Sequence, residues 1–447
     1  MKYKLVTLML ALALIASLVL FGCAPSGPSA PSAPSGPTEI LVGCNAAMTG
    51  YGAAFGSGNV WGEQAAVDDI NKLGGVYIKE FGRKIPIKLI VLDNESDPGK
   101  AATLEETLCT TEKVHILADA NTVIPMVFPE AQVAERYKIP RFSGGVPMEP
   151  WLGMRNELDK PFQYTWTWTF AIGTPAPKGS YWDKPGYTIL DTWKIPMDKY
   201  GNQTNKKVGV LASDEPDGRG WYAGFPGALK SWGYDVIGVD QSLGLFPLGT
   251  TDFTSLITAW KQANVEILWG NCPAGEFGTL WKQARGMGFK PKMAFIGRAA
   301  MFYNDVTAWG GDLPLGVCAE RWWDPSYKNC PGIGGTTPQS LFERWVKDTG
   351  QPLNPTIGWG YQQMQVIIDT LERAGTLDKE ALNKALGETN LQTIDYLVKF
   401  DENHSNNKPL FFCQWQKTDK PWKWEFPCVF SQHDDIPVTA EFIFPIP

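Results

Sequence analysis

The sequence is poor in charge, in histidine and in clustered basic residues. Charged residues make up 19% of its 447 positions, and 40 Lys and Arg stand against 47 Asp and Glu, for a net charge of −7 at pH 7. Since nucleic-acid binding requires clustered Lys and Arg, we exclude a nucleic-acid partner. The histidines, His115, His404 and His433, are scattered and no Cys-x-x-Cys pair occurs, so we expect neither a metal site nor a cofactor. With 44% hydrophobic residues, the bulk of the chain is too apolar for disorder.

Only one long apolar run occurs, at residues 5–20, after two lysines. It ends in Leu-Phe-Gly-Cys, where the cysteine is Cys23. A positive start, an apolar centre and a small-residue cleavage site are typical of a signal peptide. The ending resembles the bacterial lipobox, whose cysteine is lipidated and becomes the mature N-terminus. We therefore expect residues 1–22 to be a signal peptide and residues 23–38 a lipid-anchored Pro/Ser/Gly tether, so that the body is an extracytoplasmic, membrane-anchored lipoprotein.

Seven cysteines remain after Cys23. An exported protein can form disulfides, and an odd number leaves at least one cysteine unpaired. Cys318/Cys330 and Cys413/Cys428 each flank a short loop that contains proline, and we expect these two pairs.

Catalytic motifs are missing as well. The chain has no phosphate-binding P-loop and no G-x-S-x-G motif. Acid–base catalysis would need a positioned histidine or a carboxylate pair, and the acidic group at Asp214, Glu215 and Asp217 is better explained as a solvated turn. We expect no enzymatic activity, and a secreted hydrolase is the weakest function class considered.

Apolar, β-branched runs alternate with helix-forming segments in two blocks. The first block predicts strands at 39–44, 84–93, 115–118 and 139–142, with helices at 62–73, 98–111 and 128–137. After an irregular Trp-rich stretch at 150–205, the second predicts strands at 207–212, 234–239, 267–269 and 292–296, with helices at 221–233, 253–264 and 276–287. The pattern predicts an α/β protein of two Rossmann-like, doubly wound lobes with a cleft between them.

Parallel sheets bind ligands beyond the carboxyl ends of their strands. In this chain those ends lead into the predicted loops 45–56, 119–124, 143–147, 213–220, 270–276 and 297–301. Six loops from two lobes can converge on one small molecule.

Several segments resemble a known family. NAAMTGYGAAFG, GEQAAVDDINKLGG, DNESDPGKA, SDEPDGRG and KQARGMGFKPKMAFIG, in this order, are similar to the type I periplasmic binding proteins, and most to the leucine/isoleucine/valine-binding receptors of ABC importers. The resemblance covers nearly all of residues 39–430. It implies two lobes joined by three crossovers that close by a hinge. Lobe one would comprise residues 39–165 plus 322–397, and lobe two residues 166–321 plus 398–447.

The resemblance also implies where a ligand binds. In that family, backbone N–H groups and hydroxyls of the cleft loops bind the ligand carboxylate, an aromatic side chain of the first loop packs on the ligand, and an acidic residue of the second lobe binds its ammonium. The matching positions in this sequence are Thr49, Tyr51, Phe55, Asn121, Thr122, Ser143, Gly144, Asp217, Cys272 and Arg298.

One departure changes the expected ligand. The acid that binds the amine would align near Ala299, and Arg298 stands beside it. Burying an ammonium without a carboxylate costs several kcal/mol. Two interpretations stay open: Asp217 supplies the negative charge, or the ligand lacks an amine and Arg298 or Arg219 binds an acid or amide directly. We favour the second.

The sequence therefore predicts the substrate-binding protein of a branched-chain-amino-acid-type ABC importer. It would be monomeric, would bind a small polar, carboxylate or amide ligand between its lobes, and would dock on a membrane permease. The alternatives are a receptor of the same fold that feeds a signalling partner, and a true branched-chain amino acid binder. Most tryptophans would fill the cores, while Trp168, Trp322 or Trp323 would line the cleft and suit an apolar or ring-bearing ligand.

Overall fold

The computed structural model describes residues 36–121 and 124–447. The predicted signal peptide, Cys23, most of the tether and Thr122 lie outside these residues. The chain divides into two compact units, residues 1–37 and 38–447, and every element below belongs to the second. Within the described ranges, every helix is too short or too polar to cross a bilayer.

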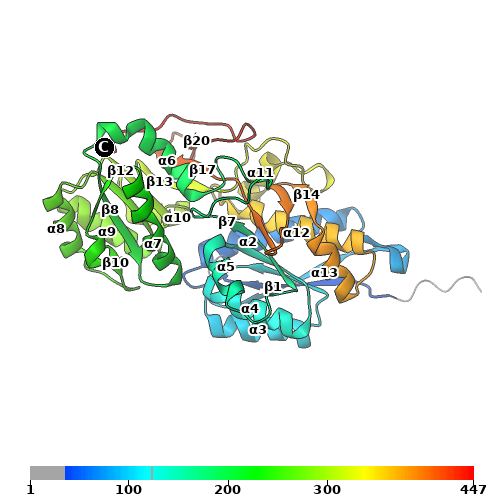
Figure 1. The fold of residues 1–447 in the computed structure, drawn as a ribbon. Helices are drawn as coiled ribbons and strands as arrows, with labels where there is room; N and C mark the ends of the chain where they lie inside the picture. Colours follow the sequence, from blue (N-terminus) through cyan, green and yellow to red (C-terminus); the bar gives the residue numbers. More distant parts are fainter. Residues whose placement is uncertain (1–35, 122–123) are drawn as a thin grey trace, which may run out of the picture. The chain divides into compact units, whose positions relative to one another are not determined.

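Lobe one is built on a six-stranded sheet in the order β16-β7-β6-β5-β1-β4, and all neighbouring strands are parallel. The strands are β1 (Ile40–Ala46), β4 (Ile87–Asp93), β5 (Ile116–Ala120), β6 (Arg141–Pro147), β7 (Thr165–Phe170) and β16 (Ser405–Asn407). The helices of this lobe are α2 (Ala53–Lys72), α3 (Pro98–Thr110), α4 (Ile124–Tyr137), α5 (Met148–Asn156), α12 (Thr356–Ala374) and α13 (Lys379–Gly387) (Figure 1).

Lobe two is built on the second large sheet, in the order β10-β8-β11-β12-β13-β17-β20, with β9 beside β8. Its parallel strands are β8 (Lys207–Ser213), β9 (Asp235–Ile237), β10 (Leu245–Phe246), β11 (Ile267–Cys272), β12 (Met293–Arg298) and β13 (Val317–Arg321). Two antiparallel strands, β17 (Phe411–Gln414) and β20 (Cys428–Phe430), complete it. The helices are α6 (Ile189–Tyr200), α7 (Pro216–Ser231), α8 (Thr254–Ala263), α9 (Ala274–Gly286) and α10 (Tyr303–Trp309).

Short elements extend the two lobes. They are the strand pairs β2 (Val76–Ile78) with β3 (Arg83–Ile85), β14 (Asn390–Thr393) with β15 (Tyr396–Lys399) and β18 (Gln416–Lys417) with β19 (Trp424–Glu425), helix α11 (Pro338–Thr349), and the 3-10 turns η1 (Lys79–Phe81), η2 (Gly201–Gln203), η3 (Val239–Gln241) and η4 (Ile333–Gly335). The parallel sheets with flanking helices confirm the predicted α/β class.

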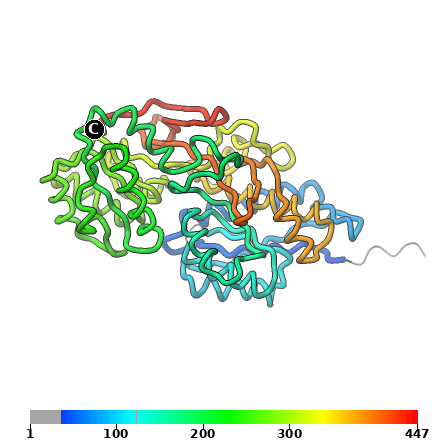
Figure 2. The backbone as a smooth tube through the Cα atoms, in the orientation of Figure 1, coloured from blue at the N-terminus to red at the C-terminus, as the bar shows by residue number. Residues whose placement is uncertain are grey.

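Within the described residues the chain passes between the lobes after β7, after β13 and between β16 and β17 (Figure 2). The first and third crossovers are hydrogen-bonded to each other. The N–H of Ala171 donates to Asn407 Oδ1 at 3.0 Å, and Asn407 Nδ2 donates to the carbonyl of Tyr187 at 3.0 Å. Trp322 and Trp323 lie in the second crossover. These connections form the hinge region between the lobes.

Strand pairing differs from the predicted lobe boundaries at two places. The predicted boundary at 165/166 cuts into β7, which pairs with β6 in the sheet of lobe one. The predicted boundary at 397/398 assigns β16 to lobe two, but Ser405 pairs with Thr167 of β7. A strand pattern does not reveal which sheet the strand joins, because that depends on partners far away in the sequence.

Helix α2 begins at Ala53, inside the predicted loop 45–56 and nine residues before the predicted helix 62–73, and it contains most of a glycine-rich segment at 49–62. A Cβ added at Gly62 would stand 2.1 Å from the carbonyl oxygen of Ile357 in α12. On the facing helix, a Cβ at Gly360 would stand 1.9 Å from the carbonyl oxygen of Asn59. The glycines therefore allow two helix backbones to touch, and they extend α2 towards the carboxyl end of β1.

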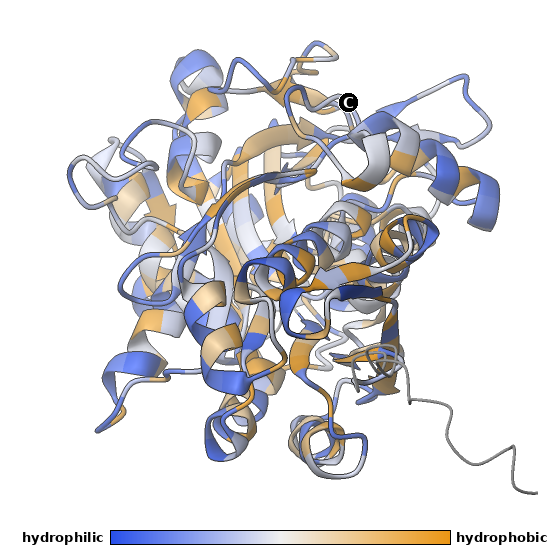
Figure 3. Ribbon diagram, turned by 90° about the vertical axis from the view of Figure 1, so that its right-hand side faces the viewer, coloured by the Kyte–Doolittle hydropathy of each residue, from blue (hydrophilic) through white to orange (hydrophobic). Residues whose placement is uncertain are grey.

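Hydrophobic side chains fill both lobes. The ribbon in Figure 3 shows hydrophobic residues on the central strands and hydrophilic residues on outer turns and loops. Many tryptophans are core residues, among them Trp151, Trp193, Trp260, Trp269 and Trp281. These positions agree with the mainly structural role expected for this residue type.

All seven cysteines of the described residues are buried and free, so the predicted disulfides are not formed. Cys413 and Cys428 face each other on β17 and β20, whereas Cys318 is in register with Gln414 and apart from Cys330 in the fold. The two pairs were predicted from the short separation of their cysteines in the sequence. This separation does not determine the distance and orientation that a disulfide requires.

Candidate functional site

A small cavity of about 40 Å³ lies between the lobes, at the carboxyl ends of their parallel strands. We call it the cleft cavity. Lobe one lines it with Phe55, Gly145, Pro147, Trp168, Phe170 and Trp359, the second crossover with Trp322, and lobe two with Asp217, Trp221, Asn271, Arg298, Met301 and Glu320. This edge of a doubly wound sheet is where ligands bind in such folds.

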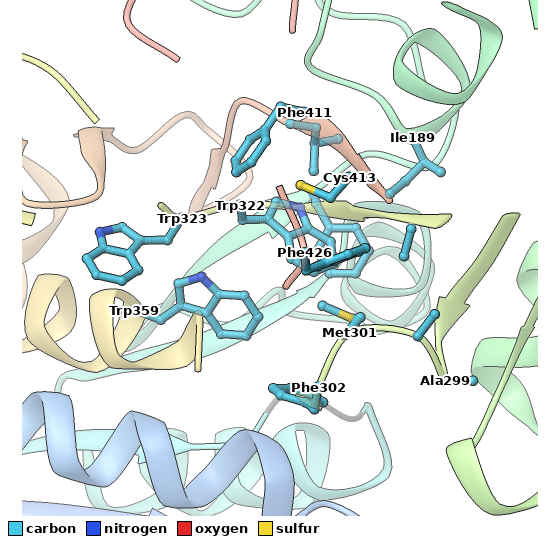
Figure 4. Close-up of a cluster of buried hydrophobic side chains, with 14 of the residues drawn as sticks. Ile189, Ala299, Met301, Phe302, Trp322, Trp323, Trp359, Phe411, Cys413 and Phe426 are labelled. Atoms are coloured by element: carbon cyan, nitrogen blue, oxygen red, sulfur yellow. The ribbon is translucent and has the colours of Figure 1, made fainter. Parts of the chain in front are cut away.

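Lobe one supplies most of an aromatic wall centred on Trp359. The ring centroid of Trp359 lies 5.0 Å from that of Trp168, 5.5 Å from that of Trp322 and 6.3 Å from that of Phe55. Trp322 in turn lies 4.7 Å from Phe170. Figure 4 shows the rings of Trp322 and Trp359 in the buried cluster near Met301. Interlocked rings of this kind form a firm surface that suits a flat or apolar ligand body.

Phe55 connects the two lobes. Its side chain projects from the first turn of α2 and meets Phe302 of lobe two, with the ring centroids 4.6 Å apart in a T-shaped arrangement. Helix α5 also contacts α7 across the cleft. Since a water molecule needs at least about 10–15 Å³, the cleft cavity admits only a group of a few atoms. A larger ligand reaches it only when the lobes separate or side chains move.

Lobe two supplies the charged groups. Arg298 Nη2 donates to Glu215 Oε1 at 2.9 Å and to Ser213 Oγ at 2.8 Å, and its Nη1 lies 3.3 Å from Asp217 Oδ2. Asn271 Nδ2 donates to the same Asp217 oxygen at 2.8 Å. The three charged side chains are 13–15% exposed. Two carboxylates therefore surround one guanidinium, and Arg298 is not a free cation.

The two carboxylates beside Arg298 have different environments. Burial raises the pKa of Asp217, although Arg298 opposes this. Burial also acts against the charged form of Glu215, but Arg298, Ser213 and a backbone amide of α7 outweigh it and hold the pKa of Glu215 below its usual value. Glu215 caps α7 by accepting hydrogen bonds from the N–H groups of Asp217 at 3.0 Å and Gly218 at 3.1 Å. It is thus the firmly ionised partner of Arg298.

Glu320 is the third acid of the cavity. Its Oε2 accepts a hydrogen bond from Trp193 Nε1 at 3.0 Å. Burial raises the pKa of Glu320 to about 7, with a smaller contribution from Asp217. At neutral pH this side chain can therefore donate or accept a proton in a hydrogen bond to a ligand.

Three buried N–H donors at the cavity have no hydrogen-bond partner among the described residues. They are Arg298 Nε, Trp322 Nε1 and Trp359 Nε1. An unmet buried donor costs about 1–3 kcal/mol. A ligand oxygen would remove this cost only where the lobes separate or side chains move, because these atoms have almost no exposed surface.

The backbone of Arg298 lies in the left-handed region, with φ 58°. This conformation is uncommon for residues other than glycine, and such strain gathers at binding sites. The neighbouring Ala299 is fully buried, whereas Arg298 and Met301 on either side of it line the cavity.

Phe55, Asp217 and Arg298 are the predicted binding residues that line the cleft cavity. Thr49 and Tyr51 lie in the same first loop and do not line the cleft cavity. Tyr51 is nevertheless close enough to Arg298, Glu215 and Asp217 for their charges to act on its pKa, which burial raises. Thr49 Oγ1 donates to Asp93 Oδ2 at 2.8 Å, and Tyr51, which is 57% exposed, donates its hydroxyl to the sulfur of a methionine in α4.

Asn121, Ser143, Gly144 and Cys272 are buried inside the lobes instead, and Thr122 lies outside the described residues. The reason is strand length. The predicted loop 143–147 belongs to β6, and the predicted loop 270–276 begins with the end of β11. Successive side chains alternate between the two sides of a strand, so Cys272 is buried in its lobe while the adjacent Asn271 lines the cleft cavity. In β6, Ser143 is likewise buried in its lobe, while Pro147 at the end of the strand lines the cavity.

A fully buried charge network occupies lobe one beneath these strand ends. Arg141 Nε donates to Glu105 Oε1 at 3.1 Å, and its Nη2 pairs with Asp119 and Glu130. Asn121 Nδ2 donates to Glu130 Oε1 at 2.9 Å. Burial raises the pKa of Glu105 to about 7 and also raises that of Glu130. The acids gather around a guanidinium, and no group in the described part of the chain is arranged to hold a metal ion.

Sequence reasoning missed Trp359, Asn271 and Glu320. Trp359 lies in the part of α12 where every residue from Thr356 to Ile368 is buried, so its surroundings are those of a core position. Asn271 precedes Cys272 at the end of a buried strand. The sequence did indicate a role for Glu320. An acid buried inside the apolar strand β13 costs free energy of folding unless it has a partner or a function.

We expect Gly145→Ala to distort the aromatic wall. A Cβ at Gly145 would stand 1.9–2.3 Å from ring atoms of Trp168, which lines the cavity. Overpacking of this kind costs about 1–3 kcal/mol and would also weaken ligand binding. Urea unfolding and ligand titration measure both effects. The control is Gly153→Ala in α5, where a Cβ meets nothing within 4 Å; equal behaviour of the two variants would contradict the prediction.

We expect Glu320→Gln to become more stabilising as pH rises. The folded pKa of about 7 lies above the unfolded value, so wild-type stability is fully present at low pH and falls between pH ~4.5 and 7 as the unfolded chain alone loses the proton. The variant lacks this loss and should gain about 3 kcal/mol relative to wild type between pH 4.5 and 8. Urea unfolding at several pH values checks this. Glu388→Gln, on an exposed side chain, is the control; the same slope in both variants would refute the role of burial at Glu320.

Comparisons with known proteins agree with this geometry. A family model described as periplasmic binding protein matches residues 39–420. The Leu/Ile/Val-binding protein homolog 1 of Brucella abortus (strain 2308) is 22% identical over 390 residues, which are 85% of this chain and 91% of the relative. The leucine-binding protein LivK of Thermotoga maritima MSB8 is a solved structure with a TM-score of 0.67 at 18% identity, covering 88% of this chain and 99% of that one. A solute-binding protein of an ABC transporter from Rhodopseudomonas palustris BisB5, solved with 3,4-dihydroxybenzoic acid, has a TM-score of 0.65 at 18% identity, covering 90% and 99%.

Proposed function

This chain belongs to the periplasmic binding protein family, in the leucine/isoleucine/valine-binding group of type I receptors, and on this premise we propose that it is the lipid-anchored substrate-binding protein of an ABC importer. It would capture a small molecule in the extracytoplasmic space and deliver it to a membrane permease without chemical change. The permease would recognise the closed lobes, since ligand binding shifts the balance between open and closed forms.

This proposal rests on the different kinds of side chain that the two lobes contribute to the cleft cavity. Lobe one brings aromatic rings and lobe two brings charged and amide groups, so neither lobe has a complete site alone. A ligand that touches both surfaces links its binding energy to lobe closure. This arrangement suits capture and release rather than catalysis.

The site favours a small ligand with an apolar or ring-bearing body and a polar end. The unmet donors of Arg298, Trp322 and Trp359 suit carboxylate or amide oxygens, while Glu320 and Asn271 suit an N–H or O–H group. A free ammonium would have to compete with Arg298 and Asn271 for Asp217, just as a carboxylate at Arg298 would compete with Glu215 and Asp217. The aromatic acid bound by the Rhodopseudomonas palustris protein is consistent with this class.

A thermal-shift screen tests the proposal. The compounds are amino acids, aromatic and aliphatic acids, primary amides and urea. A ligand at 100 times its Kd should stabilise the protein by about 2.7 kcal/mol, and we expect acids or amides with an apolar body to give the largest shift. A largest shift with leucine or valine would identify a branched-chain amino acid binder and contradict the ligand class. The absence of any shift, or turnover of the best compound, would contradict the proposed function.

Lipid anchoring at Cys23 is tested separately. In bacterial cells that express the full chain, Cys23→Ser should move the protein from the membrane fraction to the soluble extracytoplasmic fraction, because the thiol that accepts the lipid is gone. Immunoblots of cell fractions measure this. A variant that stays with the membrane would contradict the anchor.

A further inference from the structure

A second and larger cavity adjoins the cleft cavity. Its volume is about 380 Å³. Lobe one lines it with Phe342 and Leu353, and lobe two with Trp422 and Trp424 of the β18–β19 hairpin. Met301 lines both cavities. The second cavity thus continues the interlobe site past the side chain of Met301.

Six of the eighteen residues that line the second cavity are aromatic, and the buried cation Arg321 lies among them. Trp415 and Phe426 are stacked with ring centroids 4.7 Å apart. Arg321 pairs with Asp324 and donates through Nη1 to the carbonyl of Phe426 at 2.7 Å, while its Nε is buried without a partner among the described residues. The guanidinium of Arg321 also lies over the rings of Phe411 at 5.3 Å and Phe426 at 5.6 Å. Another aryl group would be a favourable neighbour here, because a ring face attracts a guanidinium.

The volumes of the two cavities suggest that each holds a different part of one ligand. About 40 Å³ holds a polar end group, whereas about 380 Å³ lies in the range of small-molecule pockets, about 300–1,000 Å³. The one lining residue that the two cavities share is a methionine, Met301, which is unbranched and changes rotamer easily. Figure 4 draws Met301 close to Phe426 of the second cavity and to Trp322 and Trp359 of the first.

We propose that the two cavities form one elongated site for an aryl-alkyl carboxylic acid or carboxamide. This rests on the proposed function and adds the shape of its substrate. The carboxyl or amide end binds beside Arg298 and Asn271, the alkyl chain passes Met301, and the aryl end lies among Trp422, Trp424 and Phe426.

Calorimetric titration with phenylacetic, 4-phenylbutyric and 6-phenylhexanoic acids and their primary amides tests this. Affinity in the wild type should rise at least about tenfold from the shortest to the longest member of a series, because each buried methylene adds affinity. Met301→Trp should remove this gain, because the larger side chain would close the passage between the two cavities. Trp422→Ala, on a half-buried side chain, should weaken only the longest member.

Two results would overturn the elongated site while leaving the proposed function standing. In the first, short members bind but longer ones bind no tighter. In the second, the gain with length persists in both Met301→Trp and Trp422→Ala. If no member of either series binds, the ligand class is wrong, and the broader thermal-shift screen then decides the proposed function independently.

Discussion

Replacing Arg298 by leucine should lower affinity for the best ligand of the screen by at least about 100-fold, which corresponds to about 2.7 kcal/mol. The substitution removes a buried donor at the cavity and leaves Glu215 and Asp217 facing each other without the cation between them. Removing one partner from a buried charge pair is strongly unfavourable, since the remaining charges lose both solvent and partner. Titration calorimetry on the folded variant measures the loss.

Arg219→Leu is the matched control. Arg219 lies on the same lobe and was an alternative carboxylate binder from the sequence, but its side chain is 65% exposed and pairs with Asp214 at 2.5 Å. It does not line the cleft cavity. Its replacement should leave affinity within a factor of about two, because exposed pairs contribute little. Equal losses in both variants would mean that Arg298 acts only through the general charge of lobe two.

Arg141→Met should destabilise the protein by about 3–5 kcal/mol, the largest effect on folding expected here. Arg141 and its partners Glu105, Asp119 and Glu130 are all fully buried, so the variant leaves three acids without their common cation. These acids support the ends of β5 and β6 below the aromatic wall. Urea unfolding measures the loss.

Arg136→Met provides the comparison for this variant. Arg136 lies in α4 of the same lobe, its side chain is 60% exposed, and it lies 3.6 Å from Glu106. The same chemical change there should cost less than about 1 kcal/mol. If Arg141→Met proves equally mild, the buried acids must be neutral without the arginine, and the network does not stabilise lobe one as described.

Most of the fold could be predicted from the sequence. The alternation of β-branched runs and helix formers indicated both lobes, and the quoted motifs indicated the family. The assignments of β7 and β16 to a sheet could not be predicted, because their pairing, as between Ser405 and Thr167, joins distant parts of the chain. Strand residues carry no local mark of their partner.

The candidate site was only partly predictable, and strand length is the main reason. Phe55, Asp217 and Arg298 were found, since they lie beyond or at strand ends. Ser143 and Cys272 were placed in loops because small or polar residues weaken a strand pattern, yet both belong to strands and point inward. Successive side chains of a strand point to opposite sides, so Cys272 is buried in its lobe while the adjacent Asn271 lines the cleft cavity.

The tryptophans show a second reason why the site could be predicted only partly from the sequence. Trp193 and Trp359 are both fully buried in apolar surroundings, yet only Trp359 lines the cleft cavity. Composition and periodicity indicate only whether a residue is buried. A residue in a closed interlobe site is as buried as a residue in the core, so these patterns do not distinguish the two. The contact between Phe55 and Phe302 shows why, since the two lobes form one apolar cluster where they meet.

A crystal structure of the complex with the strongest ligand of the thermal-shift screen tests the central claim most directly. We predict that the ligand lies between the rings of Trp322 and Trp359 and the side chain of Arg298, with an oxygen within about 3.2 Å of at least one of their unmet N–H groups. A ligand that touches one lobe only, or that binds away from these three residues, would contradict the account.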